Sequence, residues 1–315
     1  MAIGWAVGLV LIVEVGLRVA LGLGSPVLFV RDARFGYFPL GNQHLHRFFE
    51  RIDVNRFGMR SAEPPATKGK DEFRILIVGD SLAFGTTMVD QPDIFAEKIQ
   101  RELAERRVPV RVLNASSPGW APGNELEFLR AEGLYGADLV ALVYNTKDLS
   151  QPFAIYPGPA LFPTENPRTA IGELWSRYVL PRVMASVRRG QALADPGSTL
   201  DARLDPATAA AVMRTIEETR QLVISRGARF IIVFSPVVTP DVVRDQVQWD
   251  GARRDLAQWA AAQHVPVLDM TAIFASRNAA TVYFDGIHLR PAGNQLVADE
   301  FVKWLFANGV ALSAR

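Results

Sequence analysis

The sequence predicts a three-layer α/β fold, with helices on both faces of a parallel sheet of about five strands, preceded by one hydrophobic N-terminal helix. Three observations support this prediction. Short unbroken apolar runs of strand length alternate with segments of helical periodicity. Hydrophobic residues make up 49% of the 315 residues, which is enough for a sizeable core. The first 24 residues carry only two charged side chains.

Residues 3–24 form the hydrophobic segment, which is about the length that a helix needs to cross a lipid bilayer. Its two charges, Glu14 and Arg18, lie four residues apart, so on a helix they share a face and can pair. A cleaved secretory signal and a helix packed on the protein itself stay open as alternatives, although no basic start or clear cleavage site is present. We expect residues 1–25 to be a retained single-pass anchor, in contact with the membrane through residues 3–24.

The rest of the chain divides into residues 26–72, a pre-domain arm and linker, and residues 73–315, one α/β domain. Residues 26–72 mix aromatic and polar residues and end in the polar run SAEPPATKGKDE. The domain begins where the alternation of strands and helices begins. Its predicted strands cover residues 74–78, 110–113, 139–144, 229–234 and 265–268. Its predicted helices cover residues 94–107, 124–132, 206–225, 250–263 and 291–308, and Asp205 followed by proline is a typical helix start.

Residues 150–204 interrupt this alternation and contain no strong strand pattern. We interpret them as an insertion that is partly helical around residues 171–187. Such an insertion can form one wall of a cleft at the edge of the sheet.

Composition excludes several classes of function. The 34 basic residues nearly balance the 33 acidic ones, which gives no electrostatic basis for nucleic-acid binding. The chain contains no cysteine, so disulfides, thiolate metal sites and cysteine nucleophiles are excluded. No cluster of metal-ligand spacing and no nucleotide-binding glycine motif is present. We therefore expect no metal and no cofactor, and the sequence does not indicate an oligomeric state.

The first predicted strand leads directly into Gly-Asp-Ser, in the stretch RILIVGDSLAFG. Ser81 follows the strand and therefore lies at the carboxyl edge of the sheet, where ligands bind in open α/β folds. Three interpretations compete for it: a nucleophile, a phosphate-binding turn, or an ordinary helix cap. The phosphate interpretation fails because neither glycine-rich signature is complete.

A serine nucleophile needs a base, and histidine is the natural one. Of the four histidines, three lie in the pre-domain arm or at a helix end: His44, His46 and His264. His288 lies on a loop before the last helix, and Asp285 precedes it by three residues, a spacing that lets the carboxylate orient the imidazole. Taken singly, each of these residues is more typical of a helix cap or a surface pair than of a catalytic site. Together, Ser81, Asp285 and His288 predict a catalytic triad.

These residues carry a resemblance to the SGNH/GDSL hydrolase superfamily. The segment Gly79–Leu82 matches the GDSL block, Gly119 matches the glycine of the second block, and Asp285 with His288 matches the final block. The segment RIDVNRFGMRSAE resembles the lead-in of membrane-anchored bacterial members. The resemblance implies a flavodoxin-like sheet, reaction through an acyl-serine, and an oxyanion hole that includes the amides of Ser81 and Gly119.

One block departs from the family pattern. Where the family has Gly-x-Asn-Asp, this chain has Asn145-Thr146-Lys147-Asp148, so Lys147 replaces the asparagine that donates to the oxyanion. Either Lys147 or Asn145 can supply the missing donor. Loss of one such donor slows catalysis by roughly a hundredfold to a thousandfold.

The expected function is that of a membrane-anchored serine esterase or acyltransferase with an extracytoplasmic, periplasmic domain. The resemblance implies that it acts on ester-linked acyl groups, acetyl above all, of a small molecule or surface carbohydrate. The alternative is a non-catalytic binding or assembly protein that keeps the fold but has a weakened oxyanion hole.

Overall fold

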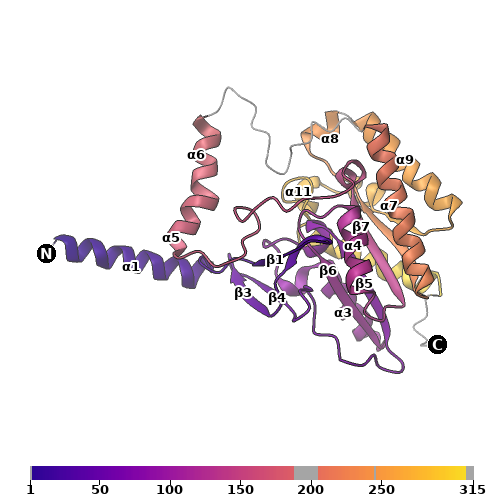
Figure 1. Cartoon of the computed structure of the whole chain (residues 1–315), viewed down its shortest axis with the longest axis horizontal. Helices are drawn as coiled ribbons and strands as arrows, with labels where there is room; N and C mark the ends of the chain where they lie inside the picture. The colour runs from indigo at the N-terminus through magenta and orange to yellow at the C-terminus, as the bar shows by residue number, and fades with distance from the viewer. Residues whose placement is uncertain (1, 188–204, 245, 310–315) are drawn as a thin grey trace.

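The computed structural model describes residues 2–187, 205–244 and 246–309. Its centre is a parallel sheet of five strands in the order β6–β5–β7–β8–β9 (Figure 1). The strands are β5 (Phe73–Gly79), β6 (Val110–Ser116), β7 (Leu139–Asn145), β8 (Arg229–Ser235) and β9 (Val267–Asp269). Because the first of them lies between the second and the third, the sheet has the flavodoxin-like order. The predicted fold class is confirmed.

Helices cover both faces of this sheet. One face carries α4 (Pro122–Glu132), α7 (Pro206–Ser225) and α9 (Gln246–Ala262), and the other carries α3 (Phe95–Glu105) and α12 (Pro291–Ala307). Alternate side chains of β5 enter the two hydrophobic clusters: Leu76 and Val78 face the first, and Ile75 and Ile77 face the second. Burial on both faces explains why this strand has no polar residue between Ile75 and Val78.

Short elements complete the connections. They are α2 (Ser81–Phe84), η1 (Gln91–Asp93), η2 (Thr146–Ser150), α8 (Pro240–Arg244), α10 (Thr271–Ala275) and α11 (Ala279–Val282). The side chain of Asp205 accepts a hydrogen bond from the amide of Thr208 at 3.0 Å, so it caps α7 as predicted. Helix α9 begins at Gln246, ahead of the predicted start at Asp250.

Residues 26–72 fold into two antiparallel hairpins before the sheet begins. The hairpins are β1 (Phe29–Asp32) with β2 (Gly36–Pro39), and β3 (Gln43–Arg47) with β4 (Glu50–Val54). Their apolar side chains belong to the same hydrophobic cluster as α4 and α7. Phe38, for example, stacks on Trp120 with ring centroids 5.2 Å apart. This segment therefore adds to the core of the α/β domain.

Two helical features extend from the body of the domain (Figure 1). Helix α1 (Ala2–Leu21) contains the window Gly4–Leu21, which is long and apolar enough to cross a membrane, as an anchor or as a signal sequence. The second feature is the insertion helix, which we define as α5 (Ala170–Glu173), η3 (Leu174–Val179) and α6 (Leu180–Val187). It confirms the helical segment predicted inside the insertion. Residues 188–204, the last part of the predicted insertion, lie outside the described residues.

A buried ion pair joins these features to the domain. Nη2 of Arg47 lies 2.6 Å from Oε1 of Glu173, and the two side chains are 3% and 0% exposed. Arg47 also donates to the carbonyl oxygen of Gly22, at 2.7 Å, and to the hydroxyl of Tyr178, at 3.1 Å. The pair thus holds together β3, the end of α1 and the insertion helix.

We predict that Glu173→Gln lowers the free energy of unfolding by about 3–5 kcal/mol, because it leaves the buried guanidinium of Arg47 without its counter-charge. Urea denaturation of the full chain in detergent measures this loss. Glu63→Gln is the matched control, since Glu63 pairs with Arg56 at the surface, where the two side chains are 45% and 52% exposed. The control is expected to lose less than about 1 kcal/mol, and equal losses in the two variants would contradict the prediction.

Candidate active site

Ser81 lies at the carboxyl edge of the sheet, as the first residue of α2 directly after β5. Asp80 caps this short helix, because its Oδ1 accepts a hydrogen bond from the amide of Leu82 at 2.8 Å. The strand order reverses between β5 and β7, and this reversal point is where open α/β sheets bind ligands. The turn therefore presents the serine hydroxyl at the expected ligand-binding edge.

The loop between α11 and α12 carries Asp285 and His288. Gly286 has a φ of +90°, which a side chain disfavours, and this lets the loop turn back on itself. The Asp285 carboxylate accepts hydrogen bonds from the amides of Ile287, at 3.1 Å, and His288, at 2.9 Å. Its Oδ2 lies 2.7 Å from Nδ1 of His288, so the carboxylate fixes the orientation of the imidazole.

The two loops meet across the edge of the sheet. Oγ of Ser81 lies 2.9 Å from Nε2 of His288, although the two residues are 207 positions apart. This distance is within the range for proton transfer between a nucleophile and its base. The structure thus brings together Ser81, His288 and Asp285, the three residues that the sequence predicted as a triad.

The charge of Asp285 is secured by its surroundings. Partial burial opposes its ionisation, but the hydrogen bonds from the ring and the amide of His288 outweigh that effect, and the pKa of Asp285 lies well below its usual value. The carboxylate therefore stays negative throughout the neutral range, opposite the ring nitrogen that it orients.

A pocket of about 220 Å³ opens beside Ser81 and His288. Besides these two residues, it is lined by the chain after α1, the end of β3, α2 with the loop that follows it, the loop after β6, and the insertion, as the sequence predicted for residues 150–204. The lining side chains from these segments include Val27, Phe29, Arg47, Phe84, Thr86, Thr87, Leu161, Phe162, Arg177 and Tyr178. A larger cavity of about 360 Å³ lies near Trp249 and Phe274, and neither Ser81 nor His288 lines it.

The predicted oxyanion donors Ser81 and Gly119 are backbone amides on adjacent loops. Gly119 follows β6 with a φ of +77°, and an added Cβ would lie 2.9 Å from the Tyr37 hydroxyl oxygen, so the loop needs glycine here. Its neighbour Pro118 lines the pocket. Within the part of the chain that the structure describes, neither amide donates a hydrogen bond to another residue. Both are thus available to an anion in the pocket.

The side chains of Asn145 and Lys147 lie elsewhere. Nδ2 of Asn145 donates to Oδ2 of Asp80 at 2.9 Å, while its Oδ1 accepts from the amide of Lys147 at 2.7 Å. Nζ of Lys147 lies 3.1 Å from a carboxylate oxygen of Asp241. Neither residue lines the pocket that contains Ser81. Donation by Asn145 or Lys147 to an oxyanion stays a prediction, and it requires either side chain to reach the pocket, which neither lines.

Three carboxyl groups lie buried beneath the nucleophile loop, which the sequence did not indicate. Asp80, Glu125 and Asp148 are all buried. Burial raises the pKa of each, and the charge of Asp80 raises those of Glu125 and Asp148 further. The hydrogen bond from the amide of Leu82 partly offsets the effect of burial on the pKa of Asp80. Within the described residues, no group of three or more His, Asp or Glu side chains is arranged to hold a metal ion.

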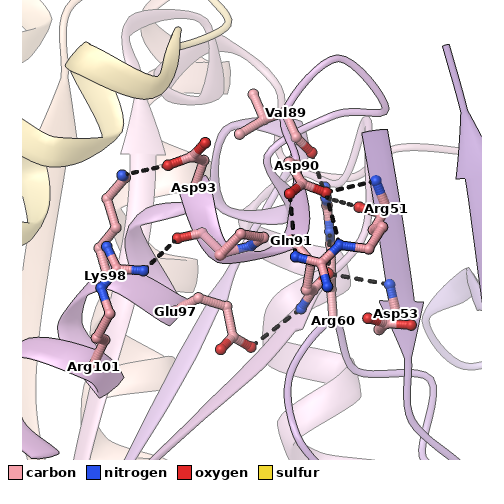
Figure 2. Close-up of polar contacts among 11 residues, drawn as sticks. Arg51, Asp53, Arg60, Val89, Asp90, Gln91, Asp93, Glu97, Lys98 and Arg101 are labelled. Atoms are coloured by element: carbon pink, nitrogen blue, oxygen red, sulfur yellow. Dashed lines mark hydrogen bonds and ion pairs between the residues drawn. The ribbon is translucent and has the colours of Figure 1, made fainter. Parts of the chain in front are cut away.

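Arg60 organises the loop that follows α2, a role that the sequence analysis missed. Its guanidinium donates to the carbonyl oxygens of Phe84, at 2.9 Å, and Val89, at 2.6 Å, and to that of Thr86. Nε donates to Oε1 of Gln91 at 3.1 Å, and Figure 2 shows Val89 and Gln91 beside the arginine. Burial lowers the pKa of Arg60 to about 10. Since Phe84 and Thr86 line the pocket, Arg60 holds one of its walls.

A chain of serine, histidine and carboxylate at the carboxyl edge of an α/β sheet is the arrangement found in serine hydrolases. The model of the GDSL-like lipase/acylhydrolase family matches residues 77–296, and the chain belongs to this family. The match includes the Gly-Asp-Ser turn and the Asp285–His288 loop. It confirms the resemblance to SGNH/GDSL hydrolases.

Solved structures to which the chain is similar include a lipase/acylhydrolase from Enterococcus faecalis, with 16% identity, a TM-score of 0.49, and coverage of 75% of this chain and 96% of that one. A catalytic mutant of the acetylxylan esterase Axe2 from Geobacillus stearothermophilus has 14% identity and a TM-score of 0.46, with coverage of 75% and 94%. The esterase EstA from Pseudoalteromonas sp. has 15% identity and a TM-score of 0.44, with coverage of 74% and 98%. No curated protein matches the chain in sequence.

We predict that Arg60→Met lowers the free energy of unfolding by about 3 kcal/mol or more, because several buried carbonyl oxygens lose their donor at about 1–3 kcal/mol each. Thermal and urea denaturation measure the loss. Arg101→Met is the control, because Arg101 is exposed and donates only to the carbonyl oxygen of Pro92, at 3.0 Å. A change below about 0.5 kcal/mol is expected for it. An Arg60→Met protein as stable as the control would show that the loop holds its shape without the arginine.

Proposed function

We propose that this protein is a membrane-anchored serine esterase or acyltransferase in which Ser81 is the nucleophile, His288 the general base and acid, and Asp285 the residue that orients His288. The observation that carries this proposal is the unbroken sequence of hydrogen bonds from Oγ of Ser81, through both ring nitrogens of His288, to the carboxylate of Asp285.

In the proposed reaction, Nε2 of His288 takes the hydroxyl proton of Ser81 as Oγ attacks the ester carbonyl carbon. The resulting oxyanion accepts hydrogen bonds from the amides of Ser81 and Gly119. Collapse of this intermediate breaks the bond to the leaving alcohol, which takes the proton from His288 and leaves an acyl-serine. Water or a second hydroxyl group then attacks the acyl-serine by the same steps, which releases the acid or a new ester and restores Ser81.

The substrate in this proposal is an ester of a short acyl group, acetyl above all, on a small molecule or a surface carbohydrate. A pocket of only about 220 Å³ with apolar side chains such as Phe84 and Phe162 supports a short acyl chain. The resemblance to membrane-anchored bacterial members supports a retained anchor at residues 3–24, an extracytoplasmic domain and a carbohydrate at the cell surface. Hydrolysis and transfer differ only in the hydroxyl group that attacks the acyl-serine.

One observation favours a second candidate, a protein that binds acyl groups without turning them over. The side-chain amide of Asn145 contacts Asp80, Lys147 is paired with Asp241, and neither residue lines the pocket of Ser81, where the family's oxyanion donor would act. The backbone amides of Ser81 and Gly119 then act without a side-chain donor from this block. Reactivity of Ser81 separates this candidate from the enzyme.

A fluorophosphonate probe tests the nucleophile. We expect the full chain in detergent to be labelled stoichiometrically and the Ser81→Ala variant not to be labelled, because the probe reacts with activated serines. Ser225→Ala, a substitution at the exposed end of α7, is the matched control and should label like the unmodified protein. Absence of labelling in correctly folded protein would favour the binding candidate.

We predict that Asp285→Asn lowers kcat for hydrolysis of p-nitrophenyl acetate by roughly a thousandfold to ten-thousandfold, because the imidazole loses the carboxylate that sets its tautomer. The lowered pKa of Asp285 keeps this carboxylate charged between about pH 5 and 8, so its own titration should not contribute to the pH profile of the unmodified protein over that range. Asp255→Asn on the exposed side of α9 is the control and should keep the kcat of the unmodified protein. An Asp285→Asn protein whose kcat falls by less than tenfold would contradict the assigned role.

A further inference from the structure

The insertion helix carries several exposed apolar side chains. Trp175 is 56% exposed, and in α6 Leu180, Val183 and Met184 are 39%, 45% and 41% exposed. The last three have the spacing i, i+3, i+4 and therefore share one face of α6, while Arg182 lies on the opposite face. A contiguous exposed apolar face with cationic residues opposite is typical of helices that bind a partner or a membrane surface.

The start of this helix is attached to α1. The carboxylate of Glu14 accepts hydrogen bonds from the amides of Ala170, at 2.8 Å, and Ile171, at 3.0 Å, which are the first residues of α5. Arg18 donates to the same carboxylate at 2.7 Å, which confirms the predicted pair, and also to the carbonyl oxygen of Arg168 at 3.2 Å. The two charges of the apolar segment thus serve as the attachment point.

The position of the attachment point along α1 determines how deep the start of the insertion helix would lie in a bilayer that α1 crosses. Glu14 precedes Leu21, the last residue of α1, by about two turns, which corresponds to about 10 Å along the helix axis. Figure 1 shows α6 rising from this end of α1 and running across its direction, away from the sheet. If α1 spans a bilayer and ends near its surface, a helix attached there and directed across it lies along the headgroup region. Amphipathic helices insert into that region to about 5–10 Å.

We propose that the insertion helix lies in the headgroup region of the bilayer that α1 crosses, with Leu180, Val183 and Met184 among the lipid chains and Arg182 toward the phosphate groups. Its partner is a phospholipid surface, because the helix begins at its contact with Glu14, within the apolar segment that would cross the bilayer. This inference rests on the membrane anchor of the proposed function, and it does not depend on the chemistry of Ser81.

The position of the helix bears on the substrate. Arg177 and Tyr178 of the same helix line the pocket with Ser81, and so do Val27 and Phe29, which follow α1. The buried pair of Arg47 and Glu173 holds these segments together. The pocket therefore lies next to the bilayer, and it takes esters that are present at the membrane surface.

The absence of cysteine makes a depth measurement direct, because every introduced cysteine can be labelled alone. The full chain is reconstituted into vesicles of phosphatidylcholine and phosphatidylglycerol as four variants, each carrying one nitroxide label. Met184→Cys reports the apolar face of α6 and Arg182→Cys the opposite face. Val10→Cys reports the interior of α1, and Val247→Cys, on α9 and 85% exposed, reports bulk water. Collision of each label with oxygen and with a water-soluble nickel chelate gives its depth.

We expect the label at Met184 to collide with oxygen more than with the chelate, as the label at Val10 does, and the label at Arg182 to lie at a shallower depth. A label at Met184 that behaves like the one at Val247, while the label at Val10 is within the bilayer, overturns the inference and leaves the anchor standing. A label at Val10 that is accessible to the chelate overturns the anchor and the inference together. Circular dichroism and thermal unfolding of the same variants show that each remains folded, and labelling by the fluorophosphonate probe reports independently on Ser81.

Discussion

The hydrogen bond between Ser81 and His288 is the contact on which the site depends, and it requires two distant segments to reach the same edge of the sheet. Ser81 is positioned by β5, which is buried on both faces. His288 is positioned by the start of α12, where the buried side chain of Asn294 accepts a hydrogen bond from the amide of Phe95 at 2.9 Å. The same side chain donates to the carbonyl oxygens of Leu289 and Arg290, at 3.2 Å and 3.1 Å. Asn294 thus ties the histidine loop to the start of α3.

The polar groups around the nucleophile have unequal charge states. Asp285 is held ionised by donors from His288, whereas burial favours the neutral form of Glu125 and Asp148. This division leaves the carboxylate that orients the imidazole charged and limits the negative charge behind the nucleophile turn. A limited charge there is favourable, because negative charge near Ser81 would oppose formation of the oxyanion in the proposed reaction.

Local patterns were sufficient to predict the sheet and the three residues Ser81, Asp285 and His288. Strands β5 and β7 are unbroken apolar runs, and the Asp285–His288 pair lies within one loop, so each gives a signal in a short stretch of sequence. No local sequence pattern indicated the buried contacts of Arg60 and Glu173. Arg47 and Glu173 are 126 residues apart, and a buried arginine cannot be distinguished by sequence from a solvated one. The Glu14–Arg18 pair was predictable from its spacing, but its amide partners, 156 and 157 residues from Glu14, were not.

Helix α1 ends at Leu21, and Pro26 and Val27 already form part of the pocket lining. Only a few residues separate the two, and the carbonyl oxygen of Gly22 among them is bound to Arg47. There is thus no long tether on which the domain can swing. With α1 as the proposed anchor, the domain would be held within a fixed, narrow zone beside the bilayer, and the esters of the proposed reaction would have to reach Ser81 there.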